Sequence, residues 1–527
     1  MSRVTLSIVA GVCLAIGQSG QAQNFTILPT DDPSTITFAT ETGNNTSACV
    51  ASGSPLYCND PLPNLQTSAA NQTAGAQTTV VDALPEHVST LNAKRLLYPG
   101  WTGQLICEYE PWFSNDGGTS HIDIGYDEHN TATIAGQDST MISRGCNINL
   151  ISFYGSTSTS SDLVFDRVTT DTVFGDLAGR GPTYPLKFAV LEDVGAFQSA
   201  CSNQSESQTI SCIETDLEAD MKYIHNNYAQ STLAPVYWVD QEKYVIGYFG
   251  ACADFPILSC PNDWNTIWTA VQDYVDGNNY GFKFIFEFGN FDVPSISAGE
   301  YAWPQPYTDS TDNDAFVDNP TSQFWWCDPN GVTCTGNSNG YLDSFYQQAA
   351  DNYTTKLSVG LLYSGFDDSN ASWGVDRVIA QQCGQVLLDT ANEVTAGGFW
   401  GTTNQMPYMQ IATWNDYEEG TEQESGVDNC YTAVNTTLTG TVMSWTLTVA
   451  PGQSSYATNN TIHHYALWTA TPNGSTLTLR KQLTHTTTSF DLSTLGLASG
   501  TYAVYLEMIG QPSMQNEMSN EVTYTQE

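Results

Sequence analysis

Short apolar runs alternate with helical patterns between residues 96 and 430. The runs predict strands at 105–109, 147–153, 186–191, 244–249, 282–288, 357–362 and 408–414. Between them, apolar residues recur at helical spacing, first at Ile213, Leu217, Met221, Ile224 and Tyr228, and then at Trp264, Ile267, Trp268, Val271 and Tyr274. The second helix is expected to begin near Asp263, whose carboxylate suits a helix cap.

This alternation predicts an α/β architecture with parallel strands, because parallel strands are buried on both faces and read as near-continuous apolar runs. The number of repeats favours a (β/α)8 TIM-type barrel over 96–430. A doubly wound sheet is the alternative, but no glycine-rich phosphate turn follows the first predicted strand. In a barrel, the residues that follow the strands meet at one end.

The pattern changes on both sides of the predicted barrel. Residues 431–527 contain alternating stretches at 442–449, 463–470 and 501–508, separated by Gly, Pro and Asn turns. They predict a C-terminal β-sandwich domain of the fibronectin III or immunoglobulin-like type. No evident cluster of aromatic residues marks it as a carbohydrate-binding module, so a structural role fits at least as well. Residues 23–95 predict an extended, Thr/Ser-rich N-terminal segment.

The first 22 residues have the features of a signal peptide. They contain Arg3, an apolar stretch from Val4 to Ile16 and a small-residue exit that ends at Ala22. The apolar stretch is too short to span a bilayer, and no later stretch approaches the required length. We therefore expect a secreted, extracellular protein without a membrane anchor.

The cysteine count agrees with export. Of the 13 cysteines, Cys13 would leave with the signal peptide, and the remaining even number suits an oxidising compartment. Four close pairs predict local disulfides: Cys49–Cys58, Cys201–Cys212, Cys252–Cys260 and Cys327–Cys334. Four cysteines are left for longer links whose pairing stays open: Cys107, Cys146, Cys383 and Cys430.

No metal site is expected. There is no CxxC motif and no histidine at zinc-finger spacing. The acids between Asp309 and Asp318 do not match an EF-hand, so a solvated loop is the better interpretation. Candidate N-glycosylation sites occur at Asn71, Asn203, Asn352, Asn370 and Asn435.

Charge and aromatic content narrow the choice of ligand. With 56 acidic and 14 basic residues, the formal charge is −42, which opposes binding to nucleic acid or to an anionic membrane. Aromatic residues make up 12% of the chain, and flat rings pack well against the C–H faces of sugars. A neutral carbohydrate is therefore the favoured ligand, although core packing explains most individual rings. Nothing indicates a cofactor, and we expect a monomer.

Residues 410–422 are the most informative stretch, because an apolar strand leads directly into carboxylates and aromatic rings. Glycoside hydrolysis needs two carboxyl groups, one to protonate the leaving oxygen and one to activate water or attack the anomeric carbon. Asp416 and Glu419, three positions apart, have the right chemistry. By composition alone, a solvated acidic loop is the favoured interpretation of the stretch.

The motif WNDYEEGTE (414–422) resembles the signature region of glycoside hydrolase family 71, the endo-α-1,3-glucanases, and of the related family 99, the endo-α-mannosidases. In that region an acid and a glutamate three positions later carry catalysis, which points to Asp416 and Glu419. Further stretches that resemble these proteins precede the motif, in the order in which the families have them. They are 97–114, 121–126, 143–155, 299–306 and 365–374. The resemblance implies an endo-acting glycoside hydrolase that cleaves an α-linked polysaccharide.

Two details bear on the substrate. Ser152 and Phe153 stand where such proteins often have Asp and Trp, which removes an acid and an indole from the second strand end. The pair Asp416-Tyr417 is similar to the glucanase branch rather than to the Glu-Trp pair of the mannosidase branch, so α-1,3-glucan is preferred. The alternatives are an endo-α-mannosidase, a catalytically inactive carbohydrate-binding or surface protein, and a structural secreted protein.

Residues at or near the predicted strand ends are further candidates for substrate binding: Tyr109, Trp112, His121, Tyr154, Glu192, Asp193, Glu287, Trp303, Asp367, Asp368, Trp414 and Tyr417. Each also has a plain structural explanation. Glu287, for example, would pair with Lys283. For the catalytic pair, Glu419 is the expected general acid. Asp416 would be the base for water or would assist the substrate's own hydroxyl in a retaining route.

Overall fold

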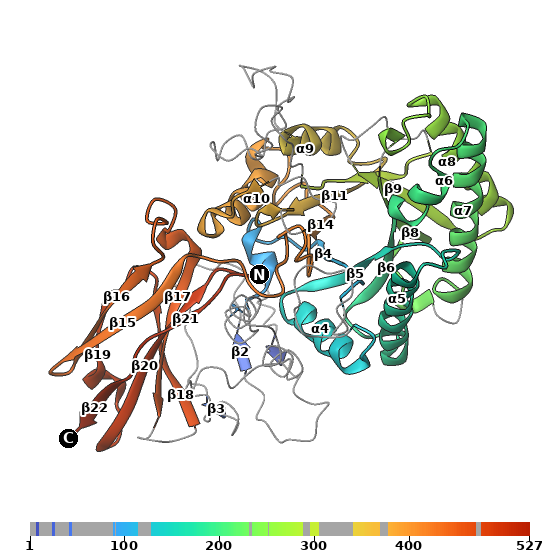
Figure 1. Ribbon diagram of the computed structural model, residues 1–527. Helices are drawn as coiled ribbons and strands as arrows, with labels where there is room; N and C mark the ends of the chain where they lie inside the picture. The colour runs from blue at the N-terminus through green and yellow to red at the C-terminus, as the bar shows by residue number, and fades with distance from the viewer. Residues whose placement is uncertain are drawn as a thin grey trace. The chain divides into compact units, whose positions relative to one another are not determined.

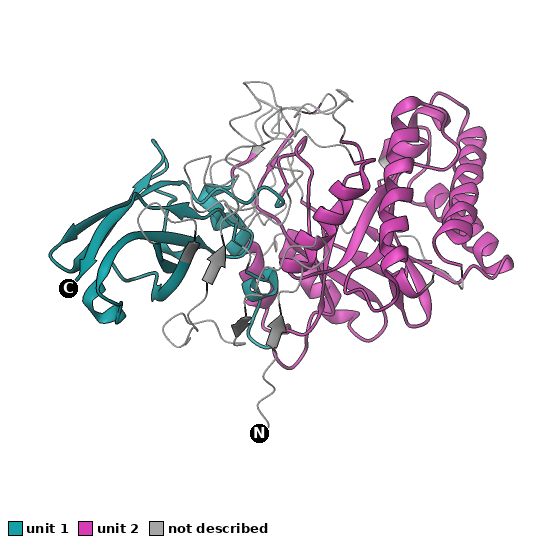
Figure 2. Ribbon diagram, turned by 90° about the horizontal axis from the view of Figure 1, so that it is seen from below, with its two compact units in different colours: residues 1–100, 381–389, 423–527 teal, residues 101–380, 390–422 magenta. Residues whose placement is uncertain are grey.

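The computed structural model describes residues 7–9, 24–26, 42–44, 88–89, 91–113, 128–230, 234–250, 252–287, 296–304, 341–368, 371, 378–470 and 476–527. The chain divides into two compact units (Figure 2). The larger consists of residues 101–380 and 390–422, and the smaller of residues 1–100, 381–389 and 423–527. Most of the predicted signal peptide and N-terminal segment lies outside the described residues, as do the acids at 309–318, Asn71 and Asn370.

The larger unit contains a nine-stranded sheet, of which eight parallel strands form a closed barrel (Figure 1). These are β4 (Gln104–Tyr109), β5 (Cys146–Phe153), β6 (Lys187–Asp193), β8 (Lys243–Phe249), β9 (Phe282–Glu287), β10 (Gly299–Tyr301), β11 (Leu357–Leu362) and β14 (Tyr408–Ile411). Their order is β6-β5-β4-β14-β11-β10-β9-β8, and pairing of β6 with β8 closes the ring. The ninth strand, β7 (Val239–Asp240), pairs antiparallel with β8. The predicted barrel is confirmed.

β10 is the barrel strand that the apolar pattern did not predict. It is only three residues long, yet it pairs in parallel with β9 on one side and β11 on the other. Three residues are too few to produce a recognisable period in the sequence. β14 ends at Ile411, earlier than the predicted strand at 408–414, because the chain then enters a loop.

In the described residues, helices lie between most consecutive barrel strands, with two between β6 and β8 and none between β9 and β10: α4 (Thr131–Ser143), α5 (Ser161–Arg180), α6 (Gln198–Cys201), α7 (Glu206–Asn227), α8 (Asn262–Gly277), α9 (Tyr341–Asp351) and α10 (Gln385–Ala396). Ser205 and Gln208 form a capping box at the start of α7. α8 begins at Asn262 after Pro261, so Asp263 lies in the first turn rather than at the cap.

The strand register sorts the side chains of the barrel into two layers. Phe153 stacks on Tyr223 of α7 at 6.0 Å between ring centroids, so it faces the helices. Tyr248 and Phe286 face Trp268 of α8, at 4.7 and 4.9 Å. Because successive side chains alternate, the intervening residues point into the barrel. Near its C-terminal end the interior therefore contains the polar residues Glu108, Glu287, Tyr301 and Gln410, all buried.

Among the described residues, the smaller unit contains a short antiparallel pair, β1 (Ser7–Val9) with β2 (Asn24–Thr26), and two larger antiparallel sheets. One consists of β15 (Tyr431–Thr439), β16 (Val442–Val449) and β19 (Ser489–Asp491); the other has the order β21 (Glu517–Met518), β20 (Gly500–Gly510), β17 (Ile462–Ala470), β18 (Thr476–Thr484) and β3 (Thr42–Asn44), with β22 (Val522–Gln526) also paired to β20. Trp445 of the first sheet packs edge-on against Tyr465 of the second, at 5.3 Å. Two sheets with a shared apolar core confirm the predicted β-sandwich.

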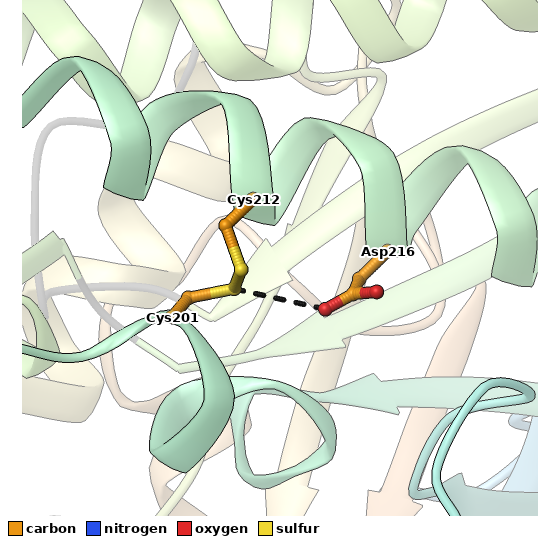
Figure 3. A group of neighbouring side chains, drawn as sticks. All are labelled: Cys201, Cys212 and Asp216. Atoms are coloured by element: carbon orange, nitrogen blue, oxygen red, sulfur yellow. Dashed lines mark hydrogen bonds between the residues drawn. A yellow bond between two sulfur atoms is a disulfide. The ribbon is translucent and has the colours of Figure 1, made fainter. Parts of the chain in front are cut away.

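The described residues contain four disulfides. Cys201–Cys212 and Cys252–Cys260 are predicted local pairs, and Cys107–Cys146 and Cys383–Cys430 join the cysteines whose pairing was open. The predicted pairs Cys49–Cys58 and Cys327–Cys334 lie outside the described residues. Cys201 Sγ is 3.6 Å from Asp216 (Figure 3). Cys201, Cys212 and Asp216 lie close enough together to suggest a metal site. The two sulfurs are bonded to each other, however, so they are not thiolates that would bind a metal ion.

Among the helices that the structure describes, none combines the length and apolar character needed to cross a membrane.

Candidate active site

Asp416 and Glu419 lie on the loop that follows β14, at the C-terminal end of the barrel. The loop is closed by hydrogen bonds from Thr413 N to Thr421 O (3.1 Å) and from Thr421 N to Asp416 O (3.2 Å). Within it, Asp416 Oδ1 accepts the backbone N–H groups of Glu418 (3.0 Å) and Glu419 (2.9 Å). The Asp416 carboxylate is therefore held in a fixed position by its own loop.

Asp416 is only 2% exposed. Burial raises its pKa to about 7, and the nearby charge of Glu418 acts in the same direction, while the two backbone N–H groups oppose the shift. A carboxyl group with this pKa changes its charge near neutral pH. That property suits a group that accepts or donates a proton during a reaction.

Two further carboxyl groups stand at the end of β4, where sequence reasoning missed them. Glu108 and Glu110 are both buried. Glu110 Oε1 accepts the hydroxyl of Ser152 (3.0 Å), and its Oε2 accepts the hydroxyl of Tyr154 (3.4 Å). Burial raises the pKa of both glutamates, and the charge of Asp416 raises both further. The sequence did contain a signal for them, because two acids at alternate positions near the end of a strand point to the same side.

Asn415 joins the loop after β14 to the segment after β4. Its side chain accepts from Glu110 N (2.8 Å) and donates to Glu110 O (2.9 Å). It also donates to Glu128 Oε1 (3.0 Å), and the other oxygen of Glu128 accepts Phe113 N (2.8 Å). The Asn415 side chain therefore fixes the backbone of Glu110 relative to the loop that carries Asp416.

Three of the predicted site residues lie around Glu110. Tyr154 donates to it, and the ring of Trp112 is 5.7 Å from the ring of Tyr154. Asp193, at the end of β6, lies close enough to Tyr154 for its charge to raise the pKa of Tyr154, and it accepts Gly195 N at 2.6 Å. Burial raises the pKa of Asp193 to about 7. The structure thus places Tyr154 and Asp193 next to the β4 acids.

Other predicted residues point away from this end of the barrel. Tyr109 donates to Gln137 of α4 at 2.7 Å, and the carboxyl of Glu192 is close enough to Asp220 on α7 for the charge of Asp220 to raise its pKa. Both side chains therefore lie between strands and helices, a position that does not fit the prediction that they bind substrate. Trp414 is fully buried, with the Arg144 guanidinium 5.1 Å from its ring centre.

The remaining candidates are distributed as follows. Lys283 forms its ion pair with Asp240, so the expected pairing of Lys283 with Glu287 is wrong. Glu287 is a buried residue of the barrel interior. Trp303 packs on Phe249 at 5.2 Å, and Tyr417 packs edge-on against Phe113 at 5.7 Å.

Asp367 lies in β12 (Phe366–Asp367) and donates its backbone N–H to Glu419 O at 2.6 Å, while Asp368 is buried. His121 is outside the described residues.

No protein-family model matches the chain, and no curated protein matches it. Among solved structures, the chain is similar to the GH99 endo-α-mannosidase from Bacteroides thetaiotaomicron, with 13% identity and a TM-score of 0.40 over 62% of this chain and 88% of that one. It is also similar to a Cellulomonas fimi endo-β-1,4-mannanase double mutant, with 10% identity and a TM-score of 0.35 over 80% and 93%. Likeness at this level assigns neither a family nor an activity.

Proposed function

We propose that this chain is a secreted, monomeric glycoside hydrolase that cleaves an α-linked polysaccharide within the chain, with Asp416 and Glu419 as its catalytic carboxyl groups. The observation that carries the proposal is the environment of Asp416. A buried carboxyl group with a pKa of about 7 is held by its own loop at the end of a TIM-type barrel where active sites lie.

The roles of the two groups follow from the chemistry of glycoside cleavage. Glu419, partly exposed on the same loop, is proposed as the general acid that protonates the leaving oxygen. Asp416 is proposed as the base that takes a proton from water or from a hydroxyl of the substrate. A base is most effective when its pKa is close to the working pH, which agrees with the pKa of Asp416.

The preferred substrate is α-1,3-glucan. This choice rests on the resemblance of Asp416-Tyr417 to the glucanase branch of the motif. An endo-α-mannosidase is the second candidate, because the same stretch resembles that family too. A catalytically inactive carbohydrate-binding protein is the third, because Ser152 and Phe153 replace an acid and an indole.

The test is release of reducing ends from α-1,3-glucan, mixed α-glucans and α-mannan by the wild type and by the Asp416→Asn and Glu419→Gln variants. Each variant is expected to lose at least about 100-fold in kcat, the usual contribution of an acid or base. Asp138→Asn is the matched control, because Asp138 is a buried acid on α4 that neighbours Asp176 rather than the site. It should retain activity.

The outcomes separate the three candidates. Cleavage of glucan alone supports the preferred substrate, and cleavage of mannan alone supports the mannosidase. If nothing is cut while polysaccharide still binds, the barrel is a binding scaffold and the catalytic proposal is wrong. Circular dichroism of each variant distinguishes loss of chemistry from loss of fold.

A further inference from the structure

Glu110 is a buried carboxyl group that the proposed mechanism with two carboxyl groups does not use. It follows Tyr109, the last residue of β4, at the C-terminal end of the barrel. Because Tyr109 points to Gln137 of α4, the next side chain along the chain points to the barrel interior. Glu110 is only 4% exposed. A carboxyl group is costly to bury, so its presence here requires an explanation.

Two hydroxyl groups from the end of the neighbouring strand hold the Glu110 carboxyl in place. Its Oε1 accepts the hydroxyl of Ser152 (3.0 Å), and its Oε2 accepts the hydroxyl of Tyr154 (3.4 Å). Ser152 precedes Phe153, which faces the helices, so Ser152 points inward from β5. The two oxygens of a carboxylate have about four acceptor positions, and these two hydrogen bonds do not use them up.

The backbone of Glu110 is fixed to the loop that carries the proposed catalytic carboxyl groups. The Asn415 side chain accepts from Glu110 N (2.8 Å) and donates to Glu110 O (2.9 Å). Asn415 directly precedes Asp416 in the chain. One side chain thus spans the space between Glu110 and this loop, so Glu110 belongs to the same end of the barrel as the proposed catalytic residues.

Two partly exposed aromatic rings stand beside the carboxyl group. The ring of Tyr154, whose hydroxyl binds Glu110, is 5.7 Å from the ring of Trp112, with 42° between the ring planes. Both residues are intermediate between buried and exposed. Aromatic rings pack against the C–H faces of sugars, and a few polar groups placed beside them fix the orientation of a ligand. A buried carboxyl group next to partly exposed rings therefore has the composition of a sugar-binding subsite.

A purely structural role explains this carboxyl group less well. The hydroxyls of Ser152 and Tyr154 need only an acceptor, and a neutral amide would supply one without the cost of removing a carboxylate from water. A carboxyl group offers something more, because it can bind sugar hydroxyls in either charge state. The carboxylate accepts from them, and the neutral acid both accepts and donates.

We propose that Glu110 is a substrate-binding residue of the active site, whose carboxyl group binds hydroxyls of one sugar unit while Trp112 and Tyr154 pack beside that unit. The inference rests on the function proposed above. It adds to Asp416 a carboxyl group that holds the sugar and takes no proton in the reaction. Ser152 and Tyr154 are its positioning residues, because their hydroxyls set the direction of the two carboxyl oxygens.

The first experiment measures kcat and KM on the polysaccharide that the wild type cleaves. Glu110→Gln keeps the shape of the side chain but replaces one carboxyl oxygen by an amide. KM should rise about 10-fold or more, as expected for loss of a hydrogen bond to a charged group, and kcat should fall by a smaller factor. Asp138→Asn, the buried acid on α4, is the control and should change neither constant.

Two results would overturn the proposal. If Glu110→Gln folds and has the KM of Asp138→Asn, the carboxyl group does not bind substrate. If it lowers kcat and leaves KM unchanged, Glu110 takes part in the chemistry and its assignment as a binding residue is wrong. A merely structural role would lower the midpoint of denaturant unfolding without raising KM.

The second experiment needs no activity. Oligosaccharides of α-1,3-glucan and of α-mannan are titrated by calorimetry into Asp416→Asn, alone and combined with Glu110→Gln or with Ser152→Ala. Glu110→Gln should weaken binding about 10-fold or more. Ser152→Ala, which removes one positioning hydroxyl and covers a Glu110 variant that fails to fold, should weaken it about 2- to 10-fold.

The outcomes separate this inference from the proposed function. If the wild type cuts no polysaccharide but oligosaccharide binding depends on Glu110, the subsite stands and the hydrolase function fails. If the wild type cuts polysaccharide and neither substitution changes oligosaccharide binding in the folded proteins, the hydrolase stands and the inference about Glu110 is wrong.

Discussion

Asp416 experiences opposing influences on its charge. Removal from water and the charge of Glu418 favour the neutral carboxyl group, whereas the backbone N–H groups of Glu418 and Glu419 favour the carboxylate. The outcome is a pKa of about 7, well above the ordinary value for aspartate. At the scale of single residues, the working pH of the proposed enzyme is therefore a property of this loop.

The first prediction concerns the pH dependence of the reaction. A base must be unprotonated, so kcat/KM should be low at pH 5 and rise through about pH 7 as Asp416 loses its proton. The measurement is kcat/KM between pH 4 and 9. A decrease through pH 7 instead would give Asp416 the role of acid and Glu419 that of base.

At the scale of elements, α8 shows how the barrel is stabilised. Trp268 is fully buried and contacts three rings on neighbouring strands, Tyr248 at 4.7 Å, Phe284 at 5.2 Å and Phe286 at 4.9 Å. These rings occupy the helix-facing positions of β8 and β9. Their alternation with inward-facing residues explains why the strands read as continuous apolar runs in the sequence.

The second prediction follows from this packing. Trp268→Ala should lower the free energy of unfolding by about 3–5 kcal/mol, because it leaves a cavity between α8 and two strands. Denaturant unfolding monitored by circular dichroism measures the change. Thr269→Ala, an exposed neighbour on the same helix, is the control and should change stability by less than about 0.5 kcal/mol. Equal effects of the two substitutions would contradict the packing argument.

At the scale of the whole molecule, the excess of acids affects stability as well as solubility. Burial raises the pKa of Asp166 to about 8 and the pKa of Asp193 to about 7, as it does for Asp416. The folded barrel therefore holds protons that the unfolded chain has already lost above about pH 4. Stability falls with rising pH wherever the folded state binds more protons.

The third prediction is that the melting temperature is lower at pH 8 than at pH 5, by about 5 °C or more. His463 acts in the opposite direction below about pH 6.5, because burial lowers its pKa to about 4, but the raised carboxyl groups outnumber it. Asp166→Asn should reduce the difference by a few degrees, since about 1 kcal/mol corresponds to roughly 2–4 °C. Calorimetry at the two pH values gives the comparison, and an unchanged difference in the variant would exclude Asp166 as a contributor.

The site could be predicted only in part. The apolar run that leads into WNDYEEGTE pointed to Asp416 and Glu419, whose placement at the end of the barrel follows from local sequence and the general geometry of barrels. Glu108 and Glu110 were overlooked in favour of Tyr109. When both faces of a strand are buried, the apolar pattern does not tell which face points inward.

The sequence by itself determined the barrel, the β-sandwich and the local disulfides Cys201–Cys212 and Cys252–Cys260, because apolar periodicity and short loop closure depend on neighbours along the chain. Only the tertiary structure decided the short strand β10, the links Cys107–Cys146 and Cys383–Cys430, and the meeting of Glu110 with Ser152. These features join segments far apart in sequence. Their pairing depends on strand order and register, which no local pattern records.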